Sequence, residues 1–490
     1  MIHVRRALLL WALLLSNFLV IWSPDVLPAS LFAWTVLREG NVDYDEFTFL
    51  DRDAYFFRAC GESTVERERP AGAELTQTRE RDRGREAAPA TVPPRSARAT
   101  GGPPAPGPRD HVCSIFPPGA ALLALPAFAP FALAAHTPED LPLLLGVGKV
   151  VAAAWEALAA VLLVAAAQRL TRDRGWAMLL GLLYLLGTSV RTISSQALWQ
   201  HGAAHLLFAF ALLVLVRLFA AEPVRSRALF GAGLALGFAI VVRQTSAVFA
   251  VGAIAALLLA RRPAQVLVAG VIVGALPLFA YDLAAFGNPL EQGYGAKPFE
   301  TPLLTGLYGL LLSPSRGLLL YSPFLAFAGP TFVRAWHARD DAFAPLWRAF
   351  GVAALGLLVG YALYTEWWGG RVFGARFLSD AFPVLVLALA AARLSIGWRR
   401  AFAASAAWAL LLHNAAALVY DQRWDTEPIS VNFDPSRLFS WSDPQWLAYL
   451  REAIVRPSPR EGAAILLSAL VLAVLLYLER PRARGGTLAT

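Results

Sequence analysis

The amino-acid sequence predicts an all-α polytopic membrane protein, with about 12 transmembrane helices and two interfacial helices in a long first extracytoplasmic loop. Hydrophobic residues make up 57% of the 490 positions and charged residues only 16%, and the mean hydropathy is +0.51. This composition excludes an ordinary soluble multidomain protein. The pI of about 9.8 comes from arginines at the ends of apolar segments, so nucleic acid is not expected as a partner.

Apolar segments recur along the chain at a length suited to crossing a bilayer, which takes about 20 residues in a helix. The predicted spans are 7–22, 141–168, 175–190, 202–220, 228–242, 245–260, 265–284, 317–333, 349–365, 377–392, 401–419 and 462–478. The first follows a basic N-terminus and lacks a small-residue cleavage site, so we expect an uncleaved helix. The domains are therefore a first helix at 1–22, a loop at 23–140, and a bundle of about 11 helices at 141–490.

Arginines fall in every second gap between the spans, and this alternation predicts the orientation of the chain. The gaps on the side of the N-terminus hold 19 arginines, whereas the opposite gaps after the first loop hold ten arginines and one lysine. Positive residues concentrate in cytoplasmic gaps. We therefore expect both termini in the cytoplasm and the polar motifs of the opposite gaps outside.

The first outer loop has ordered-looking ends and a polar middle. Residues 28–39 form an amphipathic stretch, and the apolar, proline-containing stretch 117–135 suits a helix at the bilayer interface. Residues 53–60 look like a strand that could pair with 111–116, and Cys60 and Cys113 either form a disulfide there or stay unrelated thiols. The insert at 65–110 is rich in Arg, Glu, Pro, Ala and Gly and is expected to be disordered.

Carboxylates near the first span are candidates for acid–base chemistry. Asp25 follows that span by three residues, at the level of the lipid head groups, although the Asp-x-x-Pro spacing also suits a helix cap. Asp43, Asp45 and Glu46 form an acidic cluster that could act as a general base, bind a divalent cation, or simply form a polar turn.

Polar residues at the outer ends of later spans are candidates for substrate binding. Arginines and Lys149 could bind a phosphate, and tryptophans could stack on a sugar, while snorkelling and interfacial anchoring are the alternatives. His201 and His205 share one helix face, but two histidines alone are a weak metal signal, so no metal site is predicted. The substrate-binding candidates are Lys149, Trp199, Gln200, His201, Arg243, Tyr294, Arg316, Glu366, Trp367, Arg371 and Arg376.

In segment order, the chain resembles the C-type membrane-integral glycosyltransferases. This superfamily includes protein O-mannosyltransferases, the lipid A aminoarabinose transferase and lipopolysaccharide-core galacturonosyltransferases. The segment Leu37-Arg-Glu-Gly-Asn-Val-Asp-Tyr-Asp-Glu-Phe47 is similar to the end of the family's first interfacial helix, and Phe116-Pro-Pro-Gly119 is similar to the entry of the second. Phe116 stands where many relatives have lysine, which leaves Lys149 or Arg243 for that phosphate contact.

The resemblance implies a sugar transferase of the bacterial inner membrane whose active site faces the periplasm or exterior. The donor would be a sugar on a polyprenyl phosphate, and the acceptor an envelope lipid, glycan or protein. The family's base lies just after the first span, here Asp25, but the usual Asp-Glu pair is reduced to Asp25-Val26, which keeps Asp45 and Glu46 as alternatives. No cofactor is required by this scheme, and a divalent cation stays open.

Two other functions fit parts of the pattern. A secondary transporter or lipid flippase could also have this span count, but such proteins place charges and broken helices near the membrane centre rather than at one face. A non-catalytic scaffold for envelope assembly fits the polar insert but leaves the outer arginines unexplained.

Overall fold

The computed structural model describes residues 2–17, 24–50, 56–62, 110–134, 138–291, 293–294, 298–338, 340–455 and 458–479. This part of the chain is mostly helical, and its one sheet has two strands. Among the described residues, six helices are long and apolar enough to cross a membrane: α5 (Leu141–Leu170), α7 (Gln200–Phe219), α10 (Gln265–Phe286), α14 (Ala344–Leu363), α16 (Ile396–Val419) and α19 (Pro459–Glu479). The chain therefore has the character expected of an all-α multi-pass membrane protein, while the count of twelve spans stays a prediction.

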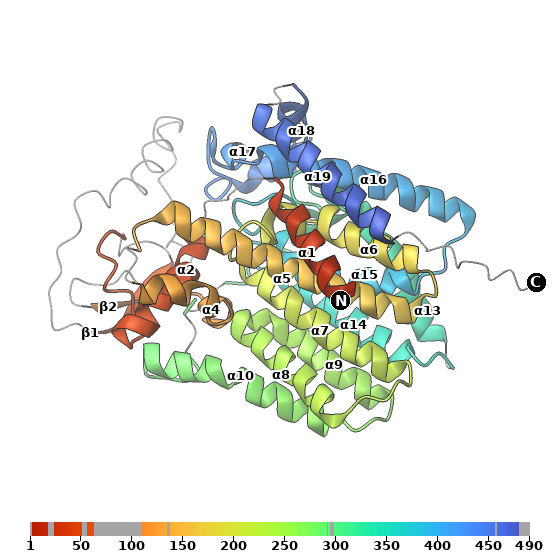
Figure 1. Ribbon diagram of the computed structural model, residues 1–490, viewed down its shortest axis with the longest axis horizontal. Coiled ribbons are helices and arrows are strands. Elements are labelled where there is room, and N and C mark those ends of the chain that lie inside the picture. The colour runs from red at the N-terminus through yellow and green to blue at the C-terminus, as the bar shows by residue number, and fades with distance from the viewer. Residues whose placement is uncertain are drawn as a thin grey trace, which may run out of the picture.

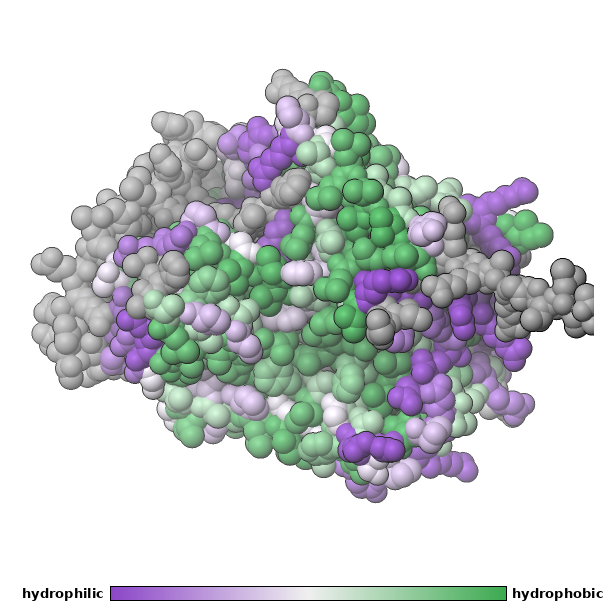
Figure 2. All heavy atoms as spheres, in the orientation of Figure 1, coloured by the Kyte–Doolittle hydropathy of each residue, from purple (hydrophilic) through white to green (hydrophobic). Residues whose placement is uncertain are grey.

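The other predicted spans correspond to shorter or broken helices. They are α1 (Ile2–Leu15), α6 (Arg174–Leu186), α8 (Ser226–Val242), α9 (Ala247–Leu259), the run α12 (Leu318–Tyr321), η5 (Pro323–Ala328) and α13 (Gly329–His337), and the pair η6 (Arg376–Ala381) and α15 (Phe382–Ala390). The breaks coincide with backbone that cannot continue a regular helix, such as Pro323. Figure 2 shows apolar side chains over much of the visible face, between polar clusters at its two ends.

The segments between the predicted spans fall into two groups according to which of them contact one another. The alternation of arginine-rich and arginine-poor segments predicts two such groups. Arg169 and Arg217 both pair with Glu222, Arg262 donates to the Leu218 carbonyl, and Arg334 donates to the Ala391 carbonyl. The gaps of the other group meet through Arg376 and Asp25, through Arg58 and Glu291, and through Trp368 and Asn432. We call the side that holds the second group the Asp25 face. That this face lies outside the cytoplasm stays a prediction.

Helix α11 (Leu303–Leu312) was not predicted, and it does not separate the two faces. Thr301, just before it, donates to the Tyr364 carbonyl, and Ser313, just after it, donates to the Leu438 carbonyl. Both partners belong to the Asp25 face, so α11 returns to the side from which it starts. The elements α12, η5 and α13 follow it, at the position of the span predicted at 317–333.

Helices α2 (Leu27–Trp34) and α4 (Gly119–Leu133) and the small sheet lie together at one end of the molecule, at the left of Figure 1. Helix α2 continues as the π-helical turn η2 (Thr35–Glu39), and it packs against α4, where an apolar interfacial helix was expected. Strands β1 (Phe57–Glu62) and β2 (Asp110–Ser114) pair antiparallel, with Phe57 opposite Ser114.

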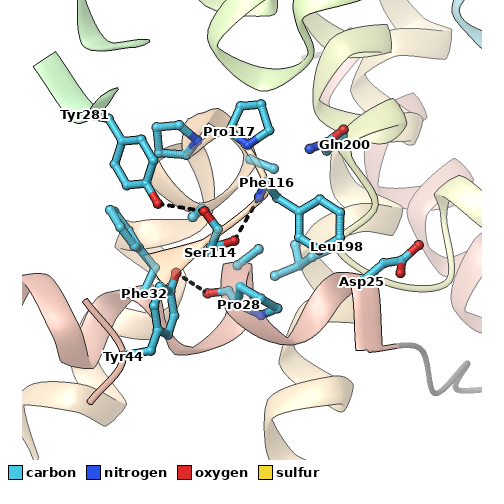
Figure 3. A pocket seen from close by; sticks show the side chains of 14 residues that line it. Asp25, Pro28, Phe32, Tyr44, Ser114, Phe116, Pro117, Leu198, Gln200 and Tyr281 are labelled. Atoms are coloured by element: carbon cyan, nitrogen blue, oxygen red, sulfur yellow. Dashed lines mark hydrogen bonds between the residues drawn. The ribbon is translucent and has the colours of Figure 1, made fainter. Parts of the chain in front are cut away.

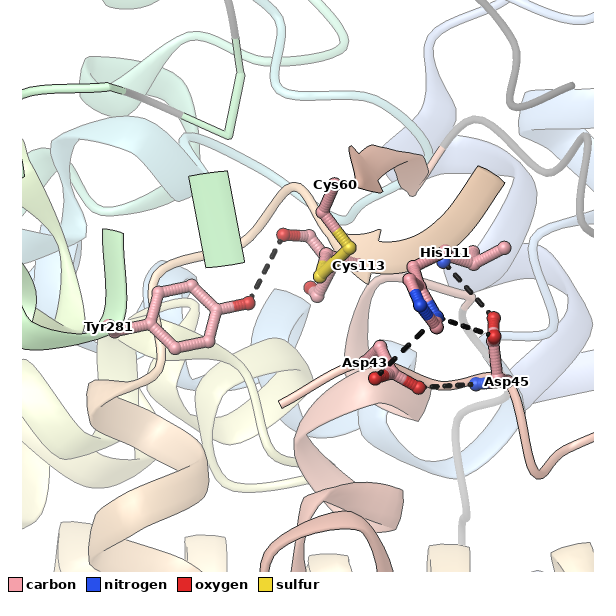
Figure 4. The surroundings of a disulfide bond; sticks show 8 residues. Asp43, Asp45, Cys60, His111, Cys113 and Tyr281 are labelled. Atoms are coloured by element: carbon pink, nitrogen blue, oxygen red, sulfur yellow. Dashed lines mark hydrogen bonds and ion pairs between the residues drawn. A yellow bond between two sulfur atoms is a disulfide. The ribbon is translucent and has the colours of Figure 1, made fainter. Parts of the chain in front are cut away.

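Of the two alternatives for the cysteines, the structure shows the disulfide, which ties these strands together. Cys60 and Cys113 are bonded, with a sequence separation of 53 residues (Figure 4). The strand pairing expected between 53–60 and 111–116 is thus confirmed, with β1 running two residues further. The predicted disordered insert falls almost wholly outside the described residues, and Asp110, its last predicted residue, begins β2 instead.

Helices α8 and α10 pack closely because both present glycines four residues apart. A Cβ atom added to Gly233 or Gly237 would overlap the backbone of α10, and one added to Gly270 or Gly274 would overlap that of α8. Small-xxx-small patterns of this kind let membrane helices approach closely. This contact fixes the end of α8, which carries Arg243.

On the Asp25 face, the segment between α16 and α19 folds into short elements. These are α17 (Arg423–Thr426), η7 (Pro435–Phe439) and α18 (Gln445–Val455), and α18 packs against α16 (Figure 1). None of them was predicted, because amphipathic pieces of 4 to 11 residues carry little periodic signal.

Candidate functional site

A small pocket opens between α2 and α4, with Asp25 and Gln200 at one end (Figure 3). Its walls are mainly apolar, and its other end carries the hydroxyl groups of Tyr44, Ser114 and Tyr281. The lining residues are Asp25, Pro28, Ala29, Phe32, Tyr44, Ser114, Phe116, Pro117, Pro118, Ala120, Ala121, Leu198, Gln200 and Tyr281. An apolar pocket with a few polar groups at its ends is a usual form of ligand site.

Asp25 lies in the 3-10 turn η1 (Pro24–Val26), immediately before α2. Its Oδ2 is 3.4 Å from Nη1 of Arg376, and the two side chains are 22% and 12% exposed. The Arg376 guanidinium in turn lies over the Trp199 ring, 4.5 Å from its centroid. The structure therefore brings together three of the predicted site residues from segments that are far apart in the sequence.

Gln200 and Tyr294 extend this group. Gln200 Nε2 donates to Tyr294 Oη at 3.4 Å, and the Tyr294 ring packs edge-on against Phe116, with the centroids 5.8 Å apart. Burial raises the pKa of Tyr294 to about 12, while the positive charge of Arg243 opposes the rise. The phenol is thus a neutral hydrogen-bonding group at physiological pH.

Arg243 follows α8 at a short turn, and its side chain is 11% exposed. Its Nε lies 3.0 Å from Thr245 Oγ1, and its Nη2 donates to the Tyr361 hydroxyl. Both Arg243 and Arg376 lie over the Phe377 ring, with guanidinium carbons 5.2 Å from its centroid. Two guanidinium groups therefore flank one aromatic ring beside the pocket residues.

Behind Arg243 the bundle holds a buried acid that sequence reasoning missed. Asp380 lies in η6, 1% exposed, with Oδ2 3.2 Å from Arg243 Nε and Oδ1 2.8 Å from His201 Nδ1. Tyr361 and Phe377 were also missed. A lone acid at the start of the predicted span 377–392 was a usable signal for Asp380, because ionisable residues in spans usually have functional or structural partners.

The two alternative bases lie in the turn that follows η2, outside the pocket lining. Asp45 accepts hydrogen bonds from His111 Nδ1 at 2.8 Å and from the Val112 amide at 3.2 Å (Figure 4). Glu46 has both carboxylate oxygens buried, and burial raises its pKa to about 7. Of the three predicted bases, Asp25 alone lines the pocket among the described residues.

Lys149 lies in a different polar cluster. Its Nζ donates to Asn17 Oδ1 at 2.7 Å, and Asn17 Nδ2 donates to Gln196 Oε1 at 3.0 Å. Arg191 in η3 (Val190–Ser194) donates from Nη1 to the Leu13 carbonyl at 2.8 Å, near the C-terminus of α1. A cation is favourable at that helix end, so this cluster anchors α1.

Arg316 and Trp367 lie in the packing of the C-terminal segment. Arg316 Nη2 is 2.6 Å from Asp425 Oδ1, and both side chains are fully buried. Trp367 packs against Phe439, with the ring centroids 5.4 Å apart. Both positions suit a structural role, since each side chain is enclosed by this segment.

Glu366 and Arg371 belong to the loop that leads to Arg376. Glu366 Oε2 accepts from the Tyr364 hydroxyl at 3.3 Å, and Arg371 is partly buried. Gly369 and Gly370 have positive φ values of 74° and 79°, a conformation that favours glycine. These glycines allow the loop to turn sharply before Arg376.

In the part of the chain that the structure describes, two groups of side chains have ligand atoms close enough together to be considered for a metal ion. They are His201, His205 and Asp380, which are buried, and Asp43, Asp45 and His111, which are half-buried. In the second group Asp45 already bonds His111 and a backbone amide, as expected of a turn that fixes β2. The first group is considered below.

Comparison with known proteins gives no family for this chain. No family model matches it, no curated protein is similar to it, and no solved structure matches it. The class defined by fold and site is therefore a multi-helix membrane protein with a carboxylate–guanidinium site beside an apolar pocket at one face.

Proposed function

We propose that the protein is a glycosyltransferase that moves a sugar from a polyprenyl phosphate to an acceptor outside the cytoplasm. The observation that carries the proposal is the convergence of Asp25, Arg376 and Arg243 at one face, beside an apolar pocket between two interfacial helices. A sugar linked through phosphate to a lipid has an apolar part that suits such a pocket and a charged part that suits such arginines. The resemblance in segment order to C-type glycosyltransferases supports the same substrate class.

In this proposal Asp25 is the general base. Its carboxylate accepts the proton of an acceptor hydroxyl, and the acceptor oxygen forms a bond to the anomeric carbon. The bond between that carbon and the phosphate oxygen breaks, and the electron pair leaves with the prenyl phosphate. Asp25 suits the role because it reaches the pocket from a rigid turn before α2.

The guanidinium groups of Arg243 and Arg376 stabilise the leaving phosphate. Negative charge on the phosphate grows as the bond breaks, so fixed cations beside it lower the barrier more than they strengthen donor binding. Arginine also matches phosphate oxygens with two parallel hydrogen bonds. The Trp199 ring holds Arg376 in place, which reduces the ordering needed during the reaction.

The test is transfer in membranes or detergent with a set of polyprenyl-phosphate sugars. We expect Asp25→Asn to lower turnover by at least about 100-fold, the usual contribution of a general base, with little change in thermal stability. Asp421→Asn is the matched control, because Asp421 lies on the same face in an exposed pair with Arg423. Unchanged turnover in Asp25→Asn would remove Asp25 as the base.

A secondary transporter or lipid flippase is the second candidate, and one observation favours it. Glu156, His205 and Asp380 are ionisable side chains buried inside the bundle, where transporters carry protons or ions. Proteoliposomes separate the two candidates. Uptake of a lipid phosphate or of protons without any sugar transfer would support the transporter and contradict the enzyme.

A further inference from the structure

A line of buried side chains runs from the interior of the bundle to Arg243. Tyr184 Oη donates to Glu156 Oε2 at 2.5 Å, and Glu156 Oε1 lies 2.8 Å from His205 Nδ1. His205 Nε2 faces Asp380 Oδ1 at 3.7 Å, and the same oxygen lies 2.8 Å from His201 Nδ1. All five side chains are at most 1% exposed. We call this set the buried relay.

Hydrogen-bond chemistry fixes the proton on His201. Arg243 Nη1 lies 2.9 Å from His201 Nε2, and a guanidinium can only donate. His201 Nε2 must therefore be the acceptor, so Nδ1 carries the proton. That proton points to Asp380 Oδ1, with Ser379 Oγ also near at 3.0 Å. The imidazole thus links the acid to the guanidinium.

The same logic argues against a metal ion on these side chains. A metal bound to His201 Nδ1 would need that nitrogen without its proton, so Nε2 would carry the proton and face a guanidinium donor at 2.9 Å. A divalent cation would also share Asp380 with Arg243, which already lies 3.2 Å from Oδ2. The acceptor atoms of His201 and Asp380 are therefore placed to hold the guanidinium of Arg243 rather than a metal ion.

We infer that Asp380 and His201 are positioning residues that hold Arg243 for binding the phosphate of a prenyl phosphate. The inference rests on the proposed function. Asp380 contacts Nε and His201 contacts Nη1, so two edges of the guanidinium are fixed from inside the bundle. An unanchored arginine would lose side-chain entropy on binding, whereas an arginine already held in place loses less. Glu156, which accepts from Tyr184, holds His205 Nδ1, and the other ring nitrogen of His205 faces Asp380 at 3.7 Å.

Equilibrium binding of geranylgeranyl phosphate to the detergent-solubilised full chain tests the inference, with geranylgeraniol as the uncharged control ligand. We expect Asp380→Asn to weaken phosphate binding by roughly 10- to 100-fold, by analogy with the loss of side chains that orient metal ligands. Binding of geranylgeraniol should not change. A general loss of structure would weaken both ligands.

Two substitutions of His201 separate its two hydrogen bonds. His201→Gln can keep the acceptor for Arg243 and lose the bond to Asp380, whereas His201→Asn can keep the bond to Asp380 and lose the acceptor. We expect the Asn variant to bind the phosphate more weakly than the Gln variant. His413→Gln is the matched control, since His413 is equally buried and, among the described side chains, its hydrogen-bond partner is the Ser322 hydroxyl.

The outcomes separate a failure of the proposed function from a failure of the inference about Asp380 and His201. If the wild type does not prefer geranylgeranyl phosphate to geranylgeraniol, both the proposed function and the inference fail. If Arg243→Ala loses the preference but Asp380→Asn and both His201 variants retain it, the inference alone fails. Stoichiometric zinc in the purified protein, lost in His201→Asn, would also overturn it. If Asp380→Asn does not fold, the order of the two His201 variants still decides.

Discussion

Replacing Gly237 by alanine should separate α8 from α10 and displace the end of α8 that carries Arg243. An added Cβ at Gly237 would overlap the Val271 carbonyl oxygen and lie 2.9 Å from the Ala275 backbone nitrogen. Neither atom belongs to a flexible side chain, so the helices themselves must move. A backbone shift of this kind typically costs about 1–3 kcal/mol.

The net effect also includes the helix propensity of the new residue. Alanine is favoured over glycine inside a helix by roughly 1 kcal/mol, which offsets part of the cost. A gap of 0.5–1 Å forfeits about a quarter to a half of the dispersion energy of the atoms that face it. We therefore expect a net loss in the free energy of unfolding of about 1–2 kcal/mol for Gly237→Ala.

Gly231 provides the matched control on the same helix. A Cβ added there would meet only the Phe210 ring, at an ordinary distance of 3.8 Å. Gly231→Ala should therefore be neutral or stabilising, up to the roughly 1 kcal/mol of propensity. The assay is unfolding of both variants in detergent by SDS titration, followed by tryptophan fluorescence. Equal stability of the two variants would refute the close-packing argument, whatever the function of the protein.

Three further predictions concern the site and the first loop. Arg376→Ala should weaken use of a polyprenyl-phosphate donor more than Arg371→Ala, because Arg376 contacts Asp25 and Trp199; equal donor affinity in both variants and the wild type would contradict the phosphate clamp. Burial raises the pKa of Glu46 from 4.5 to about 7, so the folded state binds more protons than the unfolded state between these values and stability falls as pH rises through this window. Glu46→Gln should flatten this part of the profile and be the more stable protein at pH 8, and a wild-type profile that is already flat would contradict the burial argument. Deleting 65–108 should leave folding and activity intact, since Glu62 and Asp110 pair directly and a three-residue connection can close them; loss of activity in the shortened chain would show that the insert has a role in the chemistry.

Hydropathy and charge predicted many of the helices, because both depend on neighbouring residues and on their contact with the bilayer. Each apolar run of about 20 residues must form a helix to satisfy its backbone in lipid, and α5, α7 and α10 begin and end close to their predicted limits. The disulfide could be anticipated as one of two alternatives from two cysteines in one outer loop. Helix α11 and the break between α12 and α13 could not be anticipated from the sequence. Short apolar segments do not show whether the chain crosses the membrane or turns back.

The candidate site was predicted unevenly. The sequence named Asp25, Trp199 and Arg376 as candidates, but nothing in their spacing required Arg376 to reach both of the others. Asp380 and Tyr361 were missed because each is a single polar residue beside an apolar run. Their roles depend on Arg243, which comes from another helix pair.

By itself the sequence determined that the chain has apolar helices with polar ends of two kinds, because hydropathy and arginine placement are properties of consecutive residues. Only the tertiary structure decided which polar residues meet. It placed Lys149 with Asn17, enclosed Arg316 with Asp425, and brought Arg243 to Asp380. The physical reason is that a buried charge is stable only beside a partner, and the packing of helices distant in sequence selects that partner.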